Sequence, residues 1–142
     1  MKAKSEAQLF LEQYEMLFVQ MECKQAERQQ WHDLALSITA NMGGERVQSS
    51  GSKSKMADAV ERCVAMEDEI ASQVDKLIAK QREVSQALEG LENPTEYKLL
   101  HQRYILFKQL KTIADNFHAS YDWATTTHGR ALKSVQRIRE RQ

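Results

Sequence analysis

The sequence predicts an all-α protein in which a long antiparallel coiled-coil hairpin precedes a small helical C-terminal domain. The 142 residues include one proline and five glycines, so few positions interrupt a helix. Hydrophobic residues make up 42% and charged residues 28% of the chain, a balance typical of a folding domain rather than a disordered one. Apolar side chains also recur at alternating spacings of four and three residues over two long stretches, as in a coiled-coil seam.

The first long helix is expected to end at Gly43-Gly44, because glycine adopts the left-handed turn that follows many helices. Its seam is apolar except at Lys24 and Arg28. The seam positions are Phe10, Tyr14, Leu17, Met21, Lys24, Arg28, Trp31, Ala35, Ile38 and Met42.

The second long helix is expected from Ser54 to Leu91, with a seam that is apolar except at Glu67 and Gln81. Its seam positions are Met56, Val60, Cys63, Glu67, Ile70, Val74, Leu77, Gln81, Val84, Leu88 and Leu91.

Residues 43–55, with the sequence GGERVQSSGSKSK, form the expected flexible loop between these helices. If Met42 faces Met56 across the hairpin, Cys63 faces Ala35. Cys23 then lies about 18 Å from Cys63 along the axis, whereas a disulfide needs Cα atoms within about 7 Å. We therefore expect a core thiol at Cys63, a flanking thiol at Cys23, and no disulfide or metal site between them.

The segment Asn93-Pro94-Thr95-Glu96 has the residues of a helix start, with Asn93 as N-cap and Pro94 at the first helical position. It divides a hairpin domain, residues 1–92, from a C-terminal domain, residues 93–142. Residues 1–96 hold 11 Lys and Arg against 17 Asp and Glu, a net charge of −6, whereas residues 97–142 hold 9 against 3, a net charge of +6. This asymmetry indicates a polyanionic partner for the C-terminal domain; an accidental partition of charge is the alternative.

Residues from Leu110 onward fit a helix-turn-helix template in most positions. Ala114 supplies the small residue at the fifth position, and apolar residues occupy the fourth, eighth and tenth. His118 stands at the ninth, where glycine is usual. Ser120 is the expected N-cap of a last helix running from Tyr121 to about Arg139. An ordinary helical hairpin is the alternative interpretation.

The flanks of this motif resemble known proteins. The stretches LLHQRYI and HGRALKSV look like the promoter-reading region 4 of sigma factors. Residues from about 30 to 135 also resemble the phage and prophage family of ArpU-like transcription regulators, through ITANMGGERVQSSGSKSKMADAV and SYDWATTTHGRAL. The resemblance implies a sigma-like C-terminal helix-turn-helix and a phage-type regulator that binds promoter DNA. The N-terminal stretch MKAKSEAQLF has no apolar signal core, so we expect the protein to stay in the cytoplasm.

By this resemblance, the base-contacting residues are Tyr121, Asp122, Thr125 and Thr126, because short hydroxyl side chains at such a helix start can reach base edges. The last helix has no basic residue before His128. Phosphate contacts are therefore expected from the residues before this helix and from its later turns: Lys108, Lys111, Arg130, Lys133 and Arg137. A solvated surface charge is the alternative role for each cation. Because the first turns of this helix carry no Lys or Arg, we expect RNA polymerase or a second protomer to contribute to binding.

Two other functions fit the sequence. The chain could be a coiled-coil adaptor that binds proteins, or a terminase-like DNA packaging factor, although in such factors the DNA-binding unit usually comes first. No nucleophile elbow, phosphate loop or metal-ligand spacing is present, so we expect neither an enzyme nor a cofactor. No apolar run is long enough to span a membrane. Uncovered apolar flanks of the hairpin favour a homodimer; a monomer whose C-terminal domain folds back on the hairpin is the alternative.

Overall fold

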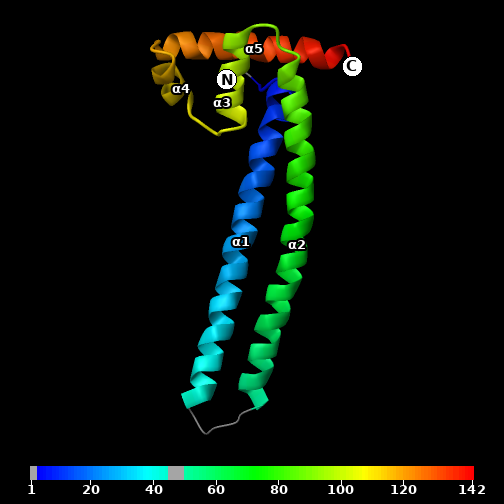
Figure 1. Cartoon of the computed structure of the whole chain (residues 1–142), viewed down its shortest axis with the longest axis vertical. Helices are drawn as coiled ribbons and strands as arrows, with labels where there is room; N and C mark the ends of the chain where they lie inside the picture. Colours follow the sequence, from blue (N-terminus) through cyan, green and yellow to red (C-terminus); the bar gives the residue numbers. More distant parts are fainter. Residues whose placement is uncertain (1–2, 45–49) are drawn as a thin grey trace. The chain divides into compact units, whose positions relative to one another are not determined.

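The computed structural model describes residues 3–44 and 50–142, and its regular elements are all helices (Figure 1). Within those two ranges there is no β-strand, which confirms the all-α class. In the same ranges, every helix is too short or too polar to cross a bilayer. The helices are α1 (Glu6–Gly44), α2 (Ser50–Glu89), α3 (Pro94–Tyr104), α4 (Leu110–Asn116) and α5 (Tyr121–Glu140).

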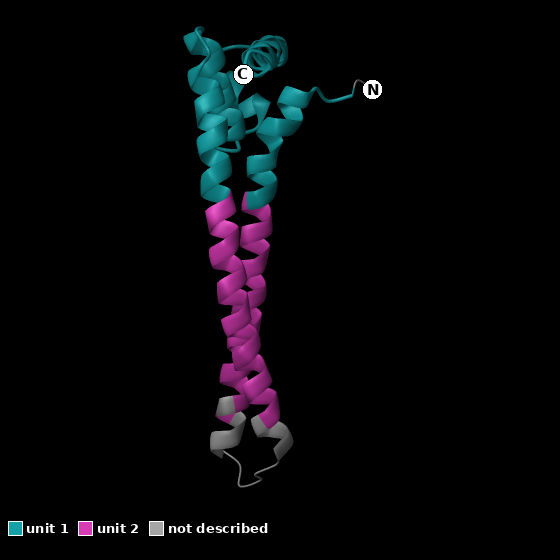
Figure 2. Ribbon diagram, turned by 90° about the vertical axis from the view of Figure 1, so that its right-hand side faces the viewer, with its two compact units in different colours: residues 1–17, 77–142 teal, residues 18–76 magenta. Residues whose placement is uncertain are grey.

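The chain divides into two compact units (Figure 2). Unit 1 comprises Met1–Leu17 and Leu77–Gln142, and unit 2 comprises Phe18–Lys76. The predicted boundary between residues 92 and 93 therefore falls inside unit 1. The first turns of α1 and the last turns of α2 group with α3, α4 and α5, because they pack on those helices.

In unit 2, α1 and α2 lie side by side (Figures 1 and 2). Between Met21 and Ile38, α1 is half-buried at every predicted seam position and exposed at the positions between them. The side chain of Met42, the last predicted seam position, lies outside the described residues. The four-three spacing thus located the inward face of α1.

The predicted seam of α2 is wrong by one residue at alternate positions. Val60 is 47% exposed and Glu67 is exposed, whereas Ala59 and Met66 are fully buried and Gln73 is 5% exposed. At two of these positions the prediction chose a valine, Val60 or Val74, over the less hydrophobic Ala59 or Gln73. The observed seam instead uses a small alanine and a glutamine whose amide donates to Gln20 Oε1 at 3.2 Å, which offsets the cost of burying a polar group.

The facing pairs are also shifted, by about one helical turn. The Cys63 thiol lies 3.9 Å from the Arg28 carbonyl oxygen, so Cys63 does not face Ala35 as predicted. Both cysteines are free, with Cys63 buried and Cys23 exposed.

Residues 50–55, which the sequence assigned to the loop 43–55, belong to α2. Because α2 begins earlier than predicted, different residues of α1 and α2 face each other. Gly43 and Gly44 end α1, and residues 45–49 lie outside the described residues. Extending a helix that already exists fixes one residue per added hydrogen bond, so poor helix formers such as Gly51 are tolerated at its start.

Unit 1 is centred on α3, α4 and α5. The Asn93 side chain accepts hydrogen bonds from the Thr95 and Glu96 amides at 2.9 and 3.3 Å, as its N-cap role predicts. Tyr97 is 37% exposed and its ring stacks on His101. The buried face of α3 consists of Glu96, Leu99, Leu100, Gln102 and Tyr104.

The first turns of α1 bind the second half of α5. The Ala7 amide donates to Gln136 Oε1 at 2.9 Å. The Arg139 guanidinium lies 3.7 Å from the centre of the Phe10 ring, and Lys80 lies 5.4 Å from it. Phe10 is therefore a cation–π partner of both α5 and α2, and these contacts fix the C-terminal half of α5.

Candidate nucleic-acid interface

The turn between α4 and α5 closes through a specific hydrogen-bond pattern. The Ala119 amide donates to the Ala114 carbonyl oxygen at 2.9 Å, and the His118 amide donates to Asp115 at 3.0 Å. This pair of bonds is a Schellman cap, which requires a left-handed residue. His118 is that residue, with φ 56°. The histidine at the position where the template has glycine therefore adopts the backbone conformation of a glycine.

Replacing His118 by glycine should stabilise the protein. A left-handed conformation costs a non-glycine residue about 1–2 kcal/mol, and the exposed His118 side chain offers little packing to lose. We expect the midpoint of thermal unfolding to rise by about 2–4 °C in His118→Gly.

The control is Phe107, which among the described residues is the other non-glycine residue with a left-handed backbone, at φ 60°. Its ring lies 5.4 Å from that of Tyr14, so Phe107→Gly should lower the midpoint instead. A lowered midpoint in His118→Gly would contradict the argument.

Helix α5 begins where the sequence predicts. The Ser120 hydroxyl accepts from the Trp123 amide at 3.1 Å and caps the helix. The helix turns a continuous stripe toward the core of unit 1, consisting of Ala124, Thr127, Ala131, Leu132 and Val135. Thr127, one of three consecutive threonines, is thus buried, whereas Thr125 and Thr126 lie outside this stripe.

The predicted base-contacting residues lie on the outer side of the first turns of α5. Tyr121 is 56% exposed, and Asp122 and Thr126 are also exposed. Thr125 is half-buried, and its hydroxyl donates to the Asp122 carbonyl oxygen at 2.9 Å. The Thr125 oxygen can still accept a hydrogen bond, but its proton is already used within the helix.

Two of the predicted phosphate-contacting residues continue the same outer stripe. Arg130 and Lys133 are exposed and follow Thr126 at spacings of four and three residues, so the three share one helix face. Lys111 is exposed on α4 and lines a hollow of about 350 Å³ together with Tyr121 and Arg103. Lys108 is half-buried in the segment between α3 and α4.

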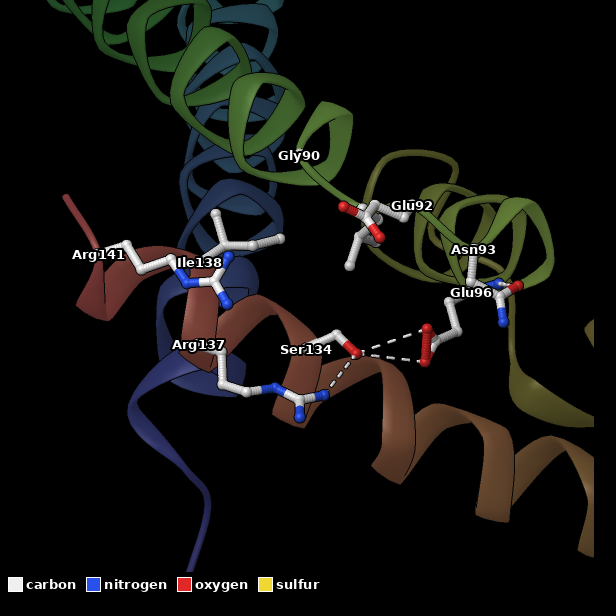
Figure 3. A pocket seen from close by; sticks show the side chains of 9 residues that line it. Gly90, Glu92, Asn93, Glu96, Ser134, Arg137, Ile138 and Arg141 are labelled. Atoms are coloured by element: carbon white, nitrogen blue, oxygen red, sulfur yellow. Dashed lines mark hydrogen bonds between the residues drawn. The ribbon is translucent and has the colours of Figure 1, made fainter.

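Arg137 lies in a different environment (Figure 3). Its Nη2 donates to the Ser134 hydroxyl at 3.2 Å, and that hydroxyl lies 3.3 Å from Oε1 of the buried Glu96. These residues line a hollow of about 290 Å³ that also includes Arg141 and Glu92. Because Arg137 donates to Ser134, whose hydroxyl in turn contacts the Glu96 carboxylate, it is a weaker candidate for a phosphate contact than Arg130 or Lys133.

A buried polar pair that joins α3 to α5 was not predicted from the sequence. The Tyr104 hydroxyl lies 2.7 Å from Nε2 of His128, and Tyr104 is 1% exposed. Burial raises the pKa of Tyr104 well above its ordinary value. Burial and then the nearby Arg103 charge lower the pKa of His128, a trend that Glu12 opposes. The hydroxyl and the imidazole thus share one hydrogen bond, and burial favours the neutral form of each group. The signal was present in the sequence, since His128 falls four residues after Ala124, on the inward stripe.

This pair should make the stability of the protein depend on pH. In the unfolded chain His128 has an ordinary pKa of about 6.5, so acid protonates the unfolded state first. The stabilisation is complete above that value and is lost as the pH falls toward the lower pKa of the folded state. We expect the thermal midpoint to fall between about pH 7.5 and 5.5.

His128→Gln should show a smaller fall over the same range, whatever its absolute stability. His32→Gln is the control, because His32 is exposed. Equal slopes in all three proteins would exclude His128 as the cause.

Comparison with other proteins identifies the family of the chain. Neither the curated proteins nor the solved structures include a match to it. A family model described as "Protein of unknown function (DUF1492)" matches residues 37–137, which include part of α1 and all of α2 to α5. Since this match covers more than half of the chain, the protein belongs to the DUF1492 family.

Proposed function

We propose that the protein is a DNA-binding transcription regulator that inserts the first turns of α5 into the major groove. The observation that carries this proposal is the outer stripe of α5. Its first turns present hydroxyl and aromatic groups, Tyr121 and Thr126, and the next turns present the cations Arg130 and Lys133. In helix-turn-helix proteins the start of the second helix contacts bases, and neighbouring cations contact phosphates.

Three further features support the proposal. The α4–α5 turn has a left-handed residue at the helix-turn-helix position, and the small Ala114 is buried at 2% exposure. Residues 97–142 carry a net charge of +6, from 9 Lys and Arg against 3 Asp and Glu. The flanking sequences resemble sigma factor region 4 and the ArpU-like phage regulators. By that resemblance the protein acts at a promoter, with RNA polymerase or a second protomer contributing to binding, and we propose that it does so in the cytoplasm.

One observation favours an alternative, a protein-binding adaptor. Asp122 is exposed beside Thr126, and His128 turns inward, so the first two turns of α5 contain no outward cation. A carboxylate at this place repels phosphates and favours a basic protein surface or assistance from polymerase.

Selection of bound duplexes from a random-sequence library tests the two functions. The DNA proposal expects enrichment of one sequence motif. It also expects the logarithm of the binding constant to fall linearly with the logarithm of the salt concentration, with a slope of about −0.9 per neutralised phosphate. Fluorescence anisotropy on the selected duplex and on a scrambled duplex measures both quantities. If no duplex binds at low salt, with or without RNA polymerase, the DNA proposal fails and the adaptor function replaces it.

A further inference from the structure

Helix α2 carries a second apolar stripe beside its buried seam. We name it the lateral stripe, and within unit 2 it consists of Ala57, Val60, Val64, Glu67, Ala71 and Val74. Successive members are three or four residues apart, so they share one face of the helix. Val60 is 47% exposed and Val64 is 53% exposed, and Ala57 and Ala71 are also exposed. Five of its six members are thus apolar, although much of the stripe faces outward.

The charges of α2 avoid this stripe. Apart from Glu67, the charged residues between positions 57 and 76 all lie on the remaining faces of the helix: Asp58, Glu61, Arg62, Asp68, Glu69, Asp75 and Lys76. A helix face that stays in water is normally polar, whereas the core of a protein interface is depleted in charge. The segregation therefore indicates a face that is covered by another helix.

The one charge in the lateral stripe is already neutralised. Arg28 of α1 approaches Glu67 with Nη2 at 2.6 Å and Nε at 3.2 Å from Oε1. The pair lines a hollow of about 340 Å³, together with Gln25, Gln29 and Ile70. Covering the stripe would therefore leave no unpaired carboxylate, the arrangement that makes a buried charge costly.

We propose that the lateral stripe binds the same stripe of a second copy, around a two-fold axis beside Glu67. The stripe is suited to contact itself, because apolar residues stand on both sides of its neutralised centre. A two-fold axis there sets Val60 of one copy against Val74 of the other, and Val64 against Ala71. A charged partner would find one neutralised ion pair in this stripe and nothing else to complement.

The size of the surface sets the strength of the dimer. Residues 57–74 span roughly 27 Å of helix. The α1 and α2 helices of one copy, which lie side by side in unit 2, are together about 20 Å wide. The contact then covers on the order of 1,000 Å² over both copies, which is near the lower limit for a specific interface. The dimer should therefore dissociate in the micromolar range. This inference rests on unit 2 alone and does not depend on the DNA proposal.

Sedimentation velocity of the full chain, from about 1 to about 300 µM, brackets the expected dissociation constant. The parent protein should change from monomer to dimer across this range. Val64→Glu should remain monomeric throughout, because it places an unpaired charge in the stripe. Ala65→Glu introduces the same charge at the next residue, which is exposed on the charged side of α2, and should dimerise like the parent.

Circular dichroism checks that each variant keeps the helix content of the parent. Should Val64→Glu lose helix, Val60→Glu provides the same test at another member of the stripe. The proposal is overturned if the parent is monomeric at every concentration, or if the stripe variant that keeps its helix content dimerises as strongly as Ala65→Glu.

Discussion

Met66→Asp is expected to lose about 3–5 kcal/mol of unfolding free energy, enough to unfold a protein of ordinary stability in part or completely. Met66 is fully buried in the seam of unit 2. The substitution removes its packing and puts a carboxylate at a position that is closed to water, while the seam cation Arg28 is already paired with Glu67. Urea denaturation followed by circular dichroism measures the loss.

The matched control is Ala65→Asp, the same new side chain one residue earlier on the same helix. Ala65 is exposed, so its substitution should change the unfolding free energy by less than about 0.5 kcal/mol. Similar urea midpoints in the two variants would show that the seam of α2 does not pass through Met66.

The double variant Arg130→Ala/Lys133→Ala is expected to weaken binding to every duplex, roughly tenfold or more, and to reduce the salt slope by about two units. Both side chains are exposed on the outer stripe of α5, where their charges are available to phosphates. Fluorescence anisotropy across a salt series measures the affinity and the slope together.

Two controls separate this effect from a general loss of charge and from base reading. Lys55→Ala/Arg82→Ala removes two exposed cations from α2 and should leave the slope unchanged. Thr126→Ala should cost about 1–3 kcal/mol on the selected duplex alone and keep the slope of the parent. If both cation pairs reduce the slope equally, α5 has no special role in binding.

The features that the sequence predicted well are local ones. Asn93 and Ser120 cap helices because a cap depends on the amides within the next turn. The inward face of α1 follows from spacing alone. Such features need no knowledge of what the helix packs against.

The missed features depend on packing between distant segments. The seam of α2 was misplaced because Val60 is more hydrophobic than Ala59, and only the position of α1 decides between them. The Tyr104–His128 pair and the Arg137–Ser134–Glu96 chain each join α3 to α5. The grouping of the first turns of α1 with α5 could not be predicted, because nothing near residue 92 shows that Ala7 binds Gln136.

The contact between Ala7 and Gln136 also bears on how the protein is made. These two residues are 129 positions apart, and Phe10 and Arg139 are separated by the same distance. During synthesis the N-terminal turns leave the ribosome first and must wait for the end of α5 before they find their partners. Folding of unit 1 should therefore be late and slow for a helical protein, since distant contacts close last. A prematurely terminated chain that lacks the end of α5 would leave the first turns of α1 without these partners.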